Sequence, residues 1–142
     1  MSDAIESRRA PEPVGPYPHA RRVGPFLFLS GIGPRKRGSS EIPGVVQSPS
    51  GEPASYDFAV QCRSTLENIK AVLEEAGASL DDVVDVTVFL TNMRDDFATL
   101  NRVYGEYFTS NRPARTTVEV TRLPTPIAVE MKMVAWLGER EP

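Results

Sequence analysis

The sequence has few of the residues that most often carry redox, metal or nucleophilic chemistry: its 142 residues include 1 cysteine and 1 histidine. The one thiol, Cys62, cannot form an internal disulfide, which fits a reducing compartment. A zinc-type site needs several Cys or His ligands, so no metal is expected. Any Ser-His or Cys-His nucleophile pair would have to use His19. The chemistry that remains belongs to Arg, Glu, Tyr, hydroxyl groups, the backbone and water.

Long apolar runs and an excess of positive charge are also missing. No stretch approaches the roughly 20 apolar residues that span a bilayer, and the first residues, MSDAIESRRAPEP, lack the apolar core of a signal peptide. The formal net charge of −3 gives no basic footprint for nucleic acid or an anionic membrane. Residues 31–38, GIGPRKRG, have the wrong glycine spacing for a dinucleotide-binding loop. We therefore expect a cytoplasmic protein whose ligand is neither nucleic acid nor a membrane.

The residues that are present have an ordinary globular composition, with 40% hydrophobic and 25% charged residues, and the length of one domain, 1–142. The polar, proline-containing residues 1–13 predict a flexible arm. Residues 33–54 are rich in Gly, Pro and Ser and predict a long loop. The remaining pattern predicts the order β-β-α-β-α-β-β, over residues 19–23, 26–30, 55–76, 83–91, 95–108, 116–121 and 129–137.

The ends of the two helices carry capping signals. In residues 55–76 the apolar positions step by four and three, which places them on one helical stripe. Ser55 is the expected N-cap of this helix, and Gly77 suits the left-handed position just after its end. Asp95 or Asp96 is expected to cap the second helix.

Two of the predicted strands are apolar on both faces: residues 26–29, FLFL, and residues 83–90, VVDVTVFL. Two helices cover only one face of such a sheet. The other face then has to bury itself, and a symmetric copy of the chain is the expected partner. In the alternative, the long loop folds back over that face.

Several different short motifs follow one another along the chain. Each one is weak, but the whole series is specific, and with it the sequence resembles the reactive intermediate deaminase (Rid) family, formerly called YjgF-like, over residues 10–137. The motifs are Gly15-Pro16-Tyr17, then LFLSG at 27–31, QCRSTLENIK at 61–70, VTVF at 86–89, DFATLN at 96–101, YGEYF at 104–108, RPAR at 112–115, TTVEVTRLP at 116–124 and VEMK at 129–132.

The resemblance implies an α+β, chorismate-mutase-like fold (bacillus type) with two helices on one face of the sheet, assembled as a homotrimer with active sites between subunits. It implies hydrolysis of enamines and imines of 2-oxo acids, with release of ammonia and without a metal or organic cofactor. The sequence looks most similar to the 2-aminomuconate deaminase branch, because of the long loop after Gly31, the double threonine after Arg115 and the run RLPTPI at 122–127. General members tend to have cysteine where this chain has Thr117, which argues against thiol chemistry.

Arg115 and Glu130 match the residues that the family uses most directly. Arg115 matches the substrate-binding arginine, whose planar guanidinium holds a carboxylate by two parallel hydrogen bonds. Glu130 matches the acidic residue that positions the attacking water, and a partly buried carboxylate suits the proton transfers of imine hydrolysis. The structural alternatives are a surface salt bridge for Arg115 and an ion pair with Lys132 for Glu130.

The remaining site residues are expected to contact the substrate. Tyr17 is expected to pack on it, and the end of a strand at Ser30 and Gly31 is expected to offer hydrogen-bonding groups. Asn101 matches a family residue, and either Thr116 or Thr117 faces the site. A basic residue is expected to bind the distal carboxylate of a dicarboxylate substrate; the candidates are Arg35, Lys36, Arg37 and Arg122. His19 is interpreted as a hydrogen-bonded turn residue.

The predicted function is therefore hydrolytic deamination of 2-aminomuconate. One alternative is a general deaminase of small 2-imino acids, such as 2-iminobutanoate, 2-iminopropanoate and the related 2-aminoacrylate. The alternative from another class is a non-catalytic trimer that binds small carboxylates or acts like a chaperone.

Overall fold

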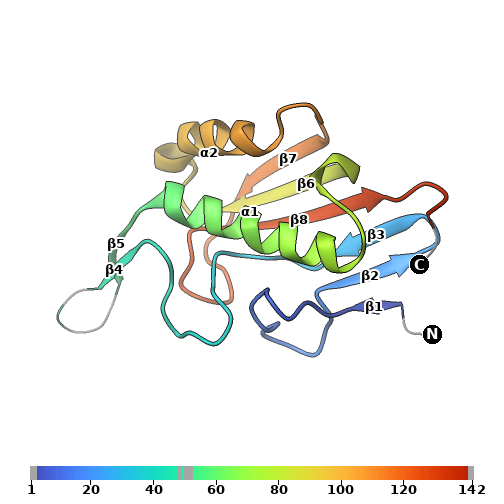
Figure 1. Ribbon diagram of the computed structural model, residues 1–142. Helices are drawn as coiled ribbons and strands as arrows, with labels where there is room; N and C mark the ends of the chain where they lie inside the picture. Colours follow the sequence, from blue (N-terminus) through green and yellow to red (C-terminus); the bar gives the residue numbers. More distant parts are fainter. Residues whose placement is uncertain (1–2, 48, 50–52, 141–142) are drawn as a thin grey trace.

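The computed structural model describes residues 3–47, 49 and 53–140. One mixed sheet has the strand order β1-β2-β3-β8-β6-β7, and a separate hairpin pairs β4 with β5 (Figure 1). The elements in chain order are β1 (Ala4–Ile5), β2 (Ala20–Val23), β3 (Phe26–Leu29), β4 (Val45–Gln47), β5 (Pro53–Tyr56), α1 (Phe58–Glu75), the short 3-10 helix η1 (Leu80–Asp82), β6 (Val83–Leu90), α2 (Met93–Tyr107), β7 (Ala114–Glu119) and β8 (Val129–Trp136).

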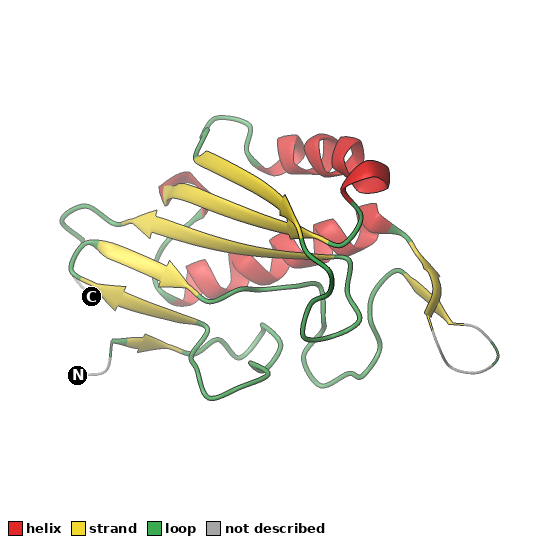
Figure 2. Cartoon of the chain, turned by 180° about the vertical axis from the view of Figure 1, so that it is seen from behind, coloured by secondary structure: helices red, strands yellow, loops and turns green. Residues whose placement is uncertain are grey.

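Both long helices lie on the same face of the sheet, which is the arrangement expected from the sequence. Seen from behind, the sheet stands in front of α1 and α2 (Figure 2). Strands β6 and β7 are parallel, whereas the other neighbouring strands are antiparallel. The α+β class and the predicted order of seven main elements are confirmed. The described residues include no helix long and apolar enough to cross a membrane.

The first helix begins later than predicted. It starts at Phe58, and the N-cap is Asp57, whose side chain accepts a hydrogen bond from Val60 N at 3.2 Å. Ser55 is not the cap, because it lies in β5 and is paired within the hairpin. The predicted left-handed residue after the helix is confirmed: Gly77 has a φ of +74°.

The second helix begins earlier than predicted. Its N-cap is Asn92, whose Oδ1 accepts a hydrogen bond from Asp95 N at 3.0 Å, so neither aspartate is the cap. Asp96 is instead buried and accepts a 2.6 Å hydrogen bond from the Tyr56 hydroxyl. This bond fastens the β4–β5 hairpin to α2. Strand β7 also begins earlier than expected, at Ala114.

Two segments predicted as irregular are structured. Residues 33–54 include the strand β4 and the start of β5, which the density of Gly, Pro and Ser concealed. Residues 3–13 are not a free arm, since β1 pairs with β2 and both Ser7 and Ala10 are buried. The side chains that hold this segment act mainly on its backbone, and a polar composition gives no sign of such contacts.

The two faces of the sheet differ in burial. On β8, Met131 and Met133 point to the helices and are buried, whereas Trp136 on the opposite face is 52% exposed. Phe26 and Phe28 on β3 share this open face and are 39% and 40% exposed. The described part of the long loop therefore does not cover the open face.

Candidate functional site

Five of the predicted site residues line one cleft, which we call the Glu130 cleft. It lies between the N-terminal segment, the end of β3 and the loop that leads into β8. The predicted residues in it are Tyr17, Ser30, Gly31, Arg35 and Glu130. The cleft also includes the wall formed by Pro124, Thr125 and Ile127, which the sequence interpretation had not assigned to the site.

The backbone of Gly31 is packed directly against the carboxylate of Glu130. A Cβ atom at Gly31 would stand 2.9 Å from Glu130 Cδ and would collide with Oε2. Only glycine permits this approach. Burial raises the pKa of the Glu130 carboxyl above its ordinary value, and the positive charge of Arg35 opposes that rise. Glu130 is thereby a stronger base than an exposed glutamate, as proton transfer to and from water requires.

A β-bulge places Ser30 and Gly31 at the cleft. The pairing of β3 with β8 runs to Phe28 opposite Val134 and resumes at Ile32 opposite Met131, so residues 29–31 stand against residues 132–133. Ser30 Oγ donates to Pro18 O at 2.7 Å, which leaves its lone pairs available as acceptors. Among the described residues, the Gly31 N–H has no hydrogen-bond acceptor.

Lys132 does not form the ion pair with Glu130 that was the structural alternative. Its Nζ donates to Leu29 O at 2.8 Å instead, inside the same bulge. No ion pair of Glu130 occurs within the described part of the chain. The carboxylate is therefore available for a ligand.

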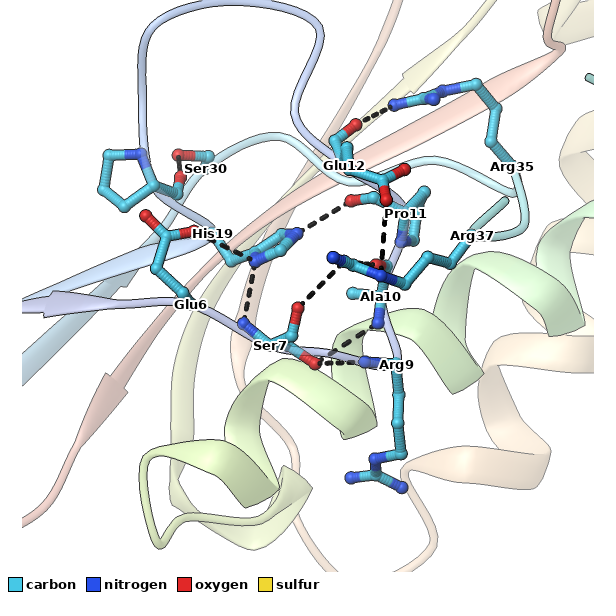
Figure 3. A network of polar contacts seen from close by, with 11 residues as sticks. Glu6, Ser7, Arg9, Ala10, Pro11, Glu12, His19, Ser30, Arg35 and Arg37 are labelled. Atoms are coloured by element: carbon cyan, nitrogen blue, oxygen red, sulfur yellow. Dashed lines mark hydrogen bonds and ion pairs between the residues drawn. The ribbon is translucent and has the colours of Figure 1, made fainter. Parts of the chain in front are cut away.

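One wall of the cleft is the N-terminal segment, which a polar network holds in place (Figure 3). His19 Nδ1 accepts from Ser7 N at 2.9 Å, and its Nε2 lies 2.7 Å from Pro11 O. This pattern places the ring proton on Nε2, and both ring nitrogens are used. His19 is thus the hydrogen-bonded structural residue that the sequence suggested.

The four basic residues that were candidates for binding the distal carboxylate lie in different places. Arg35 lines the Glu130 cleft and donates to Glu12 O at 2.8 Å. Arg37 is committed to the N-terminal segment, where it donates to Ala10 O at 2.8 Å. Lys36 and Arg122 are not among the residues that line the cleft. Arg35 is therefore the cation that this cleft offers to a ligand.

Arg115 lies in a different environment. It extends from the edge strand β7 beneath α2, and its Nη2 donates to Asn101 Oδ1 at 2.7 Å. The guanidinium carbon lies 4.8 Å from the ring centroid of Tyr104 and 5.8 Å from that of Phe97. Thr117 shares the face of β7 that carries Arg115, whereas Thr116 points to the opposite face. We call Arg115, Asn101 and Thr117, with the two rings, the Arg115 group.

The side chains of Arg115 and Glu130 point to opposite faces of the sheet. Arg115 is paired with Val86 of β6, and Glu130 is paired with Phe89 of the same strand. Residues three apart on a strand point to opposite faces. One chain therefore does not bring Arg115 together with Tyr17 and Glu130, although the sequence motifs assign all of them to one site.

The role of two aromatic residues was missed from the sequence. Neither Phe97 nor Tyr104 was assigned to the site, but Phe97 is 39% exposed and both rings flank the guanidinium. Their spacing with Asn101, four and then three residues, was a usable signal, because it places all three on one face of a helix. Arg115 lies under this face because β7 packs against α2, and the spacing of residues in the sequence does not predict this packing.

Comparison with known proteins finds a family model and relatives that match nearly the whole chain. Residues 7–137 match the family model described as endoribonuclease L-PSP. A RutC family protein of Pyrococcus abyssi is 45% identical over 134 residues, covering 94% of this chain and 96% of that protein. The 2-iminobutanoate/2-iminopropanoate deaminase of Escherichia coli K12 is 36% identical over 138 residues, covering 95% and 98%. The crystal structure of E. coli TdcF with bound serine has a TM-score of 0.81 at 36% identity, covering 94% and 97%.

Proposed function

This chain belongs to the Rid family, whose model is described as endoribonuclease L-PSP, and we propose that it hydrolyses enamines and imines of 2-oxo acids to the oxo acid and ammonia. The observation that carries the proposal is the half-buried carboxylate of Glu130, which is held against Gly31 in an open cleft without an ion-pair partner among the described residues. A relative named as a deaminase of two small 2-imino acids, and another solved with bound serine, support a ligand that carries a carboxylate.

The reaction needs one carboxylate anchor and one base. Arg115 grips the carboxylate beside the reacting carbon, which fixes the direction of the C=N bond. Glu130 takes a proton from water as the water oxygen attacks the imine carbon, and the nitrogen gains a proton. The resulting carbinolamine loses ammonia as its hydroxyl becomes the carbonyl of the oxo acid. An enamine substrate first tautomerises to the imine.

The two parts of this site meet between protomers of a homotrimer. Strand alternation places Arg115 and Glu130 on opposite faces of one chain, so a complete site takes the arginine of one protomer and the Glu130 cleft of its neighbour. The open face, with Phe26, Phe28 and Trp136 exposed, favours burial against further copies. Light scattering is expected to give the mass of a trimer, and a stable monomer at micromolar concentration would contradict the proposal.

The substrate proposed from the sequence is 2-aminomuconate, a dicarboxylate. Arg35 supports this choice, because it lines the cleft that contains Glu130 and adds a positive charge there to that of Arg115 from the neighbouring protomer. Its partner Glu12 contributes only a backbone carbonyl to it, so the guanidinium keeps donors for a distal carboxylate. Replacing Arg35 with alanine is expected to lower the preference for 2-aminomuconate over monocarboxylic imines. Lys36→Ala is the matched control, since Lys36 lies outside the cleft.

A second candidate is a general deaminase of small 2-imino acids, which the name of the E. coli relative favours. Ammonia release separates the candidates when 2-aminomuconate and 2-aminoacrylate are generated in situ and presented to the wild type, Arg115→Ala and Glu130→Gln. Turnover of the first far above the second supports the specialised enzyme, and comparable turnover supports the general one. Carboxylate binding without turnover would overturn both proposals in favour of a non-catalytic binding protein.

A further inference from the structure

One face of α2 forms a cradle around Arg115. Phe97, Asn101 and Tyr104 follow each other at intervals of four and three residues and therefore share a helical face. Figure 1 shows this helix alongside β7, the strand that carries Arg115. The contacts are a 2.7 Å hydrogen bond to Asn101 Oδ1 and two rings at 4.8 Å and 5.8 Å from the guanidinium carbon.

The cradle fixes both the position and the rotation of the guanidinium. A cation is attracted to the negative face of an aromatic ring, and this attraction holds the guanidinium over Tyr104. The bond to Asn101 uses one N–H group of Nη2 and sets the rotation of the planar group. Among the described residues Arg115 donates no other hydrogen bond, so its remaining donors stay available for a carboxylate.

The ring of Tyr104, rather than its hydroxyl, makes this contact. The hydroxyl is buried and has no hydrogen-bond partner among the described residues. The ring itself is held by Phe108, whose ring centroid lies 4.6 Å away. Phe108 is buried in the core and is the C-cap residue of α2, directly after the last turn of the helix. The Tyr104 ring is thus a fixed surface under the guanidinium.

We propose that Tyr104 and Asn101 are positioning residues, which hold the guanidinium of Arg115 so that its unused N–H groups receive the substrate carboxylate. This inference rests on the proposed role of Arg115. An arginine without the cradle has to lose rotational freedom when it binds its ligand, whereas an arginine held in advance has already lost it. Removing the ring therefore weakens capture of the carboxylate and leaves the chemistry at Glu130 unchanged.

The test is a double-mutant cycle in the full-length assembled protein. Tyr104→Leu removes the ring and is expected to lower kcat/KM for 2-iminobutanoate about 3- to 30-fold, mainly through KM. Tyr104→Phe keeps the ring and is expected to stay within about twofold of the wild type, because the lost hydroxyl had no partner. If Tyr104→Leu does not assemble, Tyr104→Met supplies a flexible apolar side chain without a ring.

The second arm of the cycle repeats these changes in the Arg115→Ala background. A positioning residue acts through Arg115, so Tyr104→Leu is expected to have no further effect there. The same factor in both backgrounds would overturn the inference and show a merely structural role, as would equal losses for Tyr104→Phe and Tyr104→Leu. If Arg115→Ala alone left kcat/KM intact, the proposed function itself would fail, which is a different result.

Asn101→Ala gives an independent measure, because Asn101 is exposed and its loss does not disturb the core. It is expected to raise KM and to have little effect on kcat. Its effect is also expected to vanish in the Arg115→Ala background. A lowered kcat at unchanged KM would contradict the positioning role of Asn101.

Discussion

Gly31→Ala tests the geometry at Glu130 most simply, because the change adds one methyl group at a known place. The new Cβ would stand 2.9 Å from Glu130 Cδ, while ordinary contacts begin at 3.4 Å. The carboxylate therefore has to retreat by about 0.5–1 Å before normal packing is restored. Since a displacement of about 1 Å at a reacting centre can cost about 100-fold in rate, kcat is expected to fall about 10- to 100-fold.

The assay is the initial rate of ammonia release from 2-iminobutanoate, with the thermal midpoint measured on the same samples. Gly105→Ala is the matched control, because nothing lies within 4 Å of a Cβ at Gly105, which is in α2. This control is expected to keep the wild-type rate and to gain about 0.5–1 kcal/mol of stability from better helix propensity. Wild-type kcat in Gly31→Ala would refute the argument that Glu130 has to lie against this backbone.

Two further predictions concern charges. The positive charge of Arg35 opposes the rise in the pKa of Glu130, so Arg35→Ala is expected to raise that pKa further. The acid limb of the profile of kcat/KM against pH is then expected to move to higher pH. Lys36→Ala is the control and is expected to leave the limb in place. A limb that moves to lower pH, or not at all, would contradict this. Asn101→Asp places a carboxylate beside Arg115, where it competes with the substrate; KM for the imine is expected to rise about 10-fold or more, and an unchanged KM would exclude Arg115 as the anchor.

Much of the fold could be predicted from local patterns. The apolar stripes gave both helices and the β-branched runs gave the central strands, because burial on one face leaves a period in the sequence. The helix caps were displaced, since several Ser, Asp and Asn residues lie near the start of each helix and all of them suit the cap position. Ser55 was excluded from this role by strand pairing in the hairpin, which local sequence does not report.

The sequence motifs name candidate residues for the site but not how those residues are arranged. The Rid motifs named Arg115, Tyr17 and Glu130, but they carry no information about the face of the sheet on which each residue lies. That information depends on register, in which Arg115 is opposite Val86 and Glu130 is opposite Phe89. Register between strands far apart in the chain is set by the packed core and is not visible in any one segment.

The most direct test of the shared site mixes two variants, each of which is expected to be inactive alone. Arg115→Ala keeps the Glu130 cleft, and Glu130→Gln keeps the arginine, so a protomer of each kind supplies what its neighbour lacks. If the protein forms the proposed trimer, co-expression at equal amounts gives trimers in which about one quarter of the sites combine an intact arginine with an intact cleft. We expect ammonia release to recover to about a quarter of the wild-type rate. Hybrid trimers as inactive as their parents would contradict a site shared between protomers.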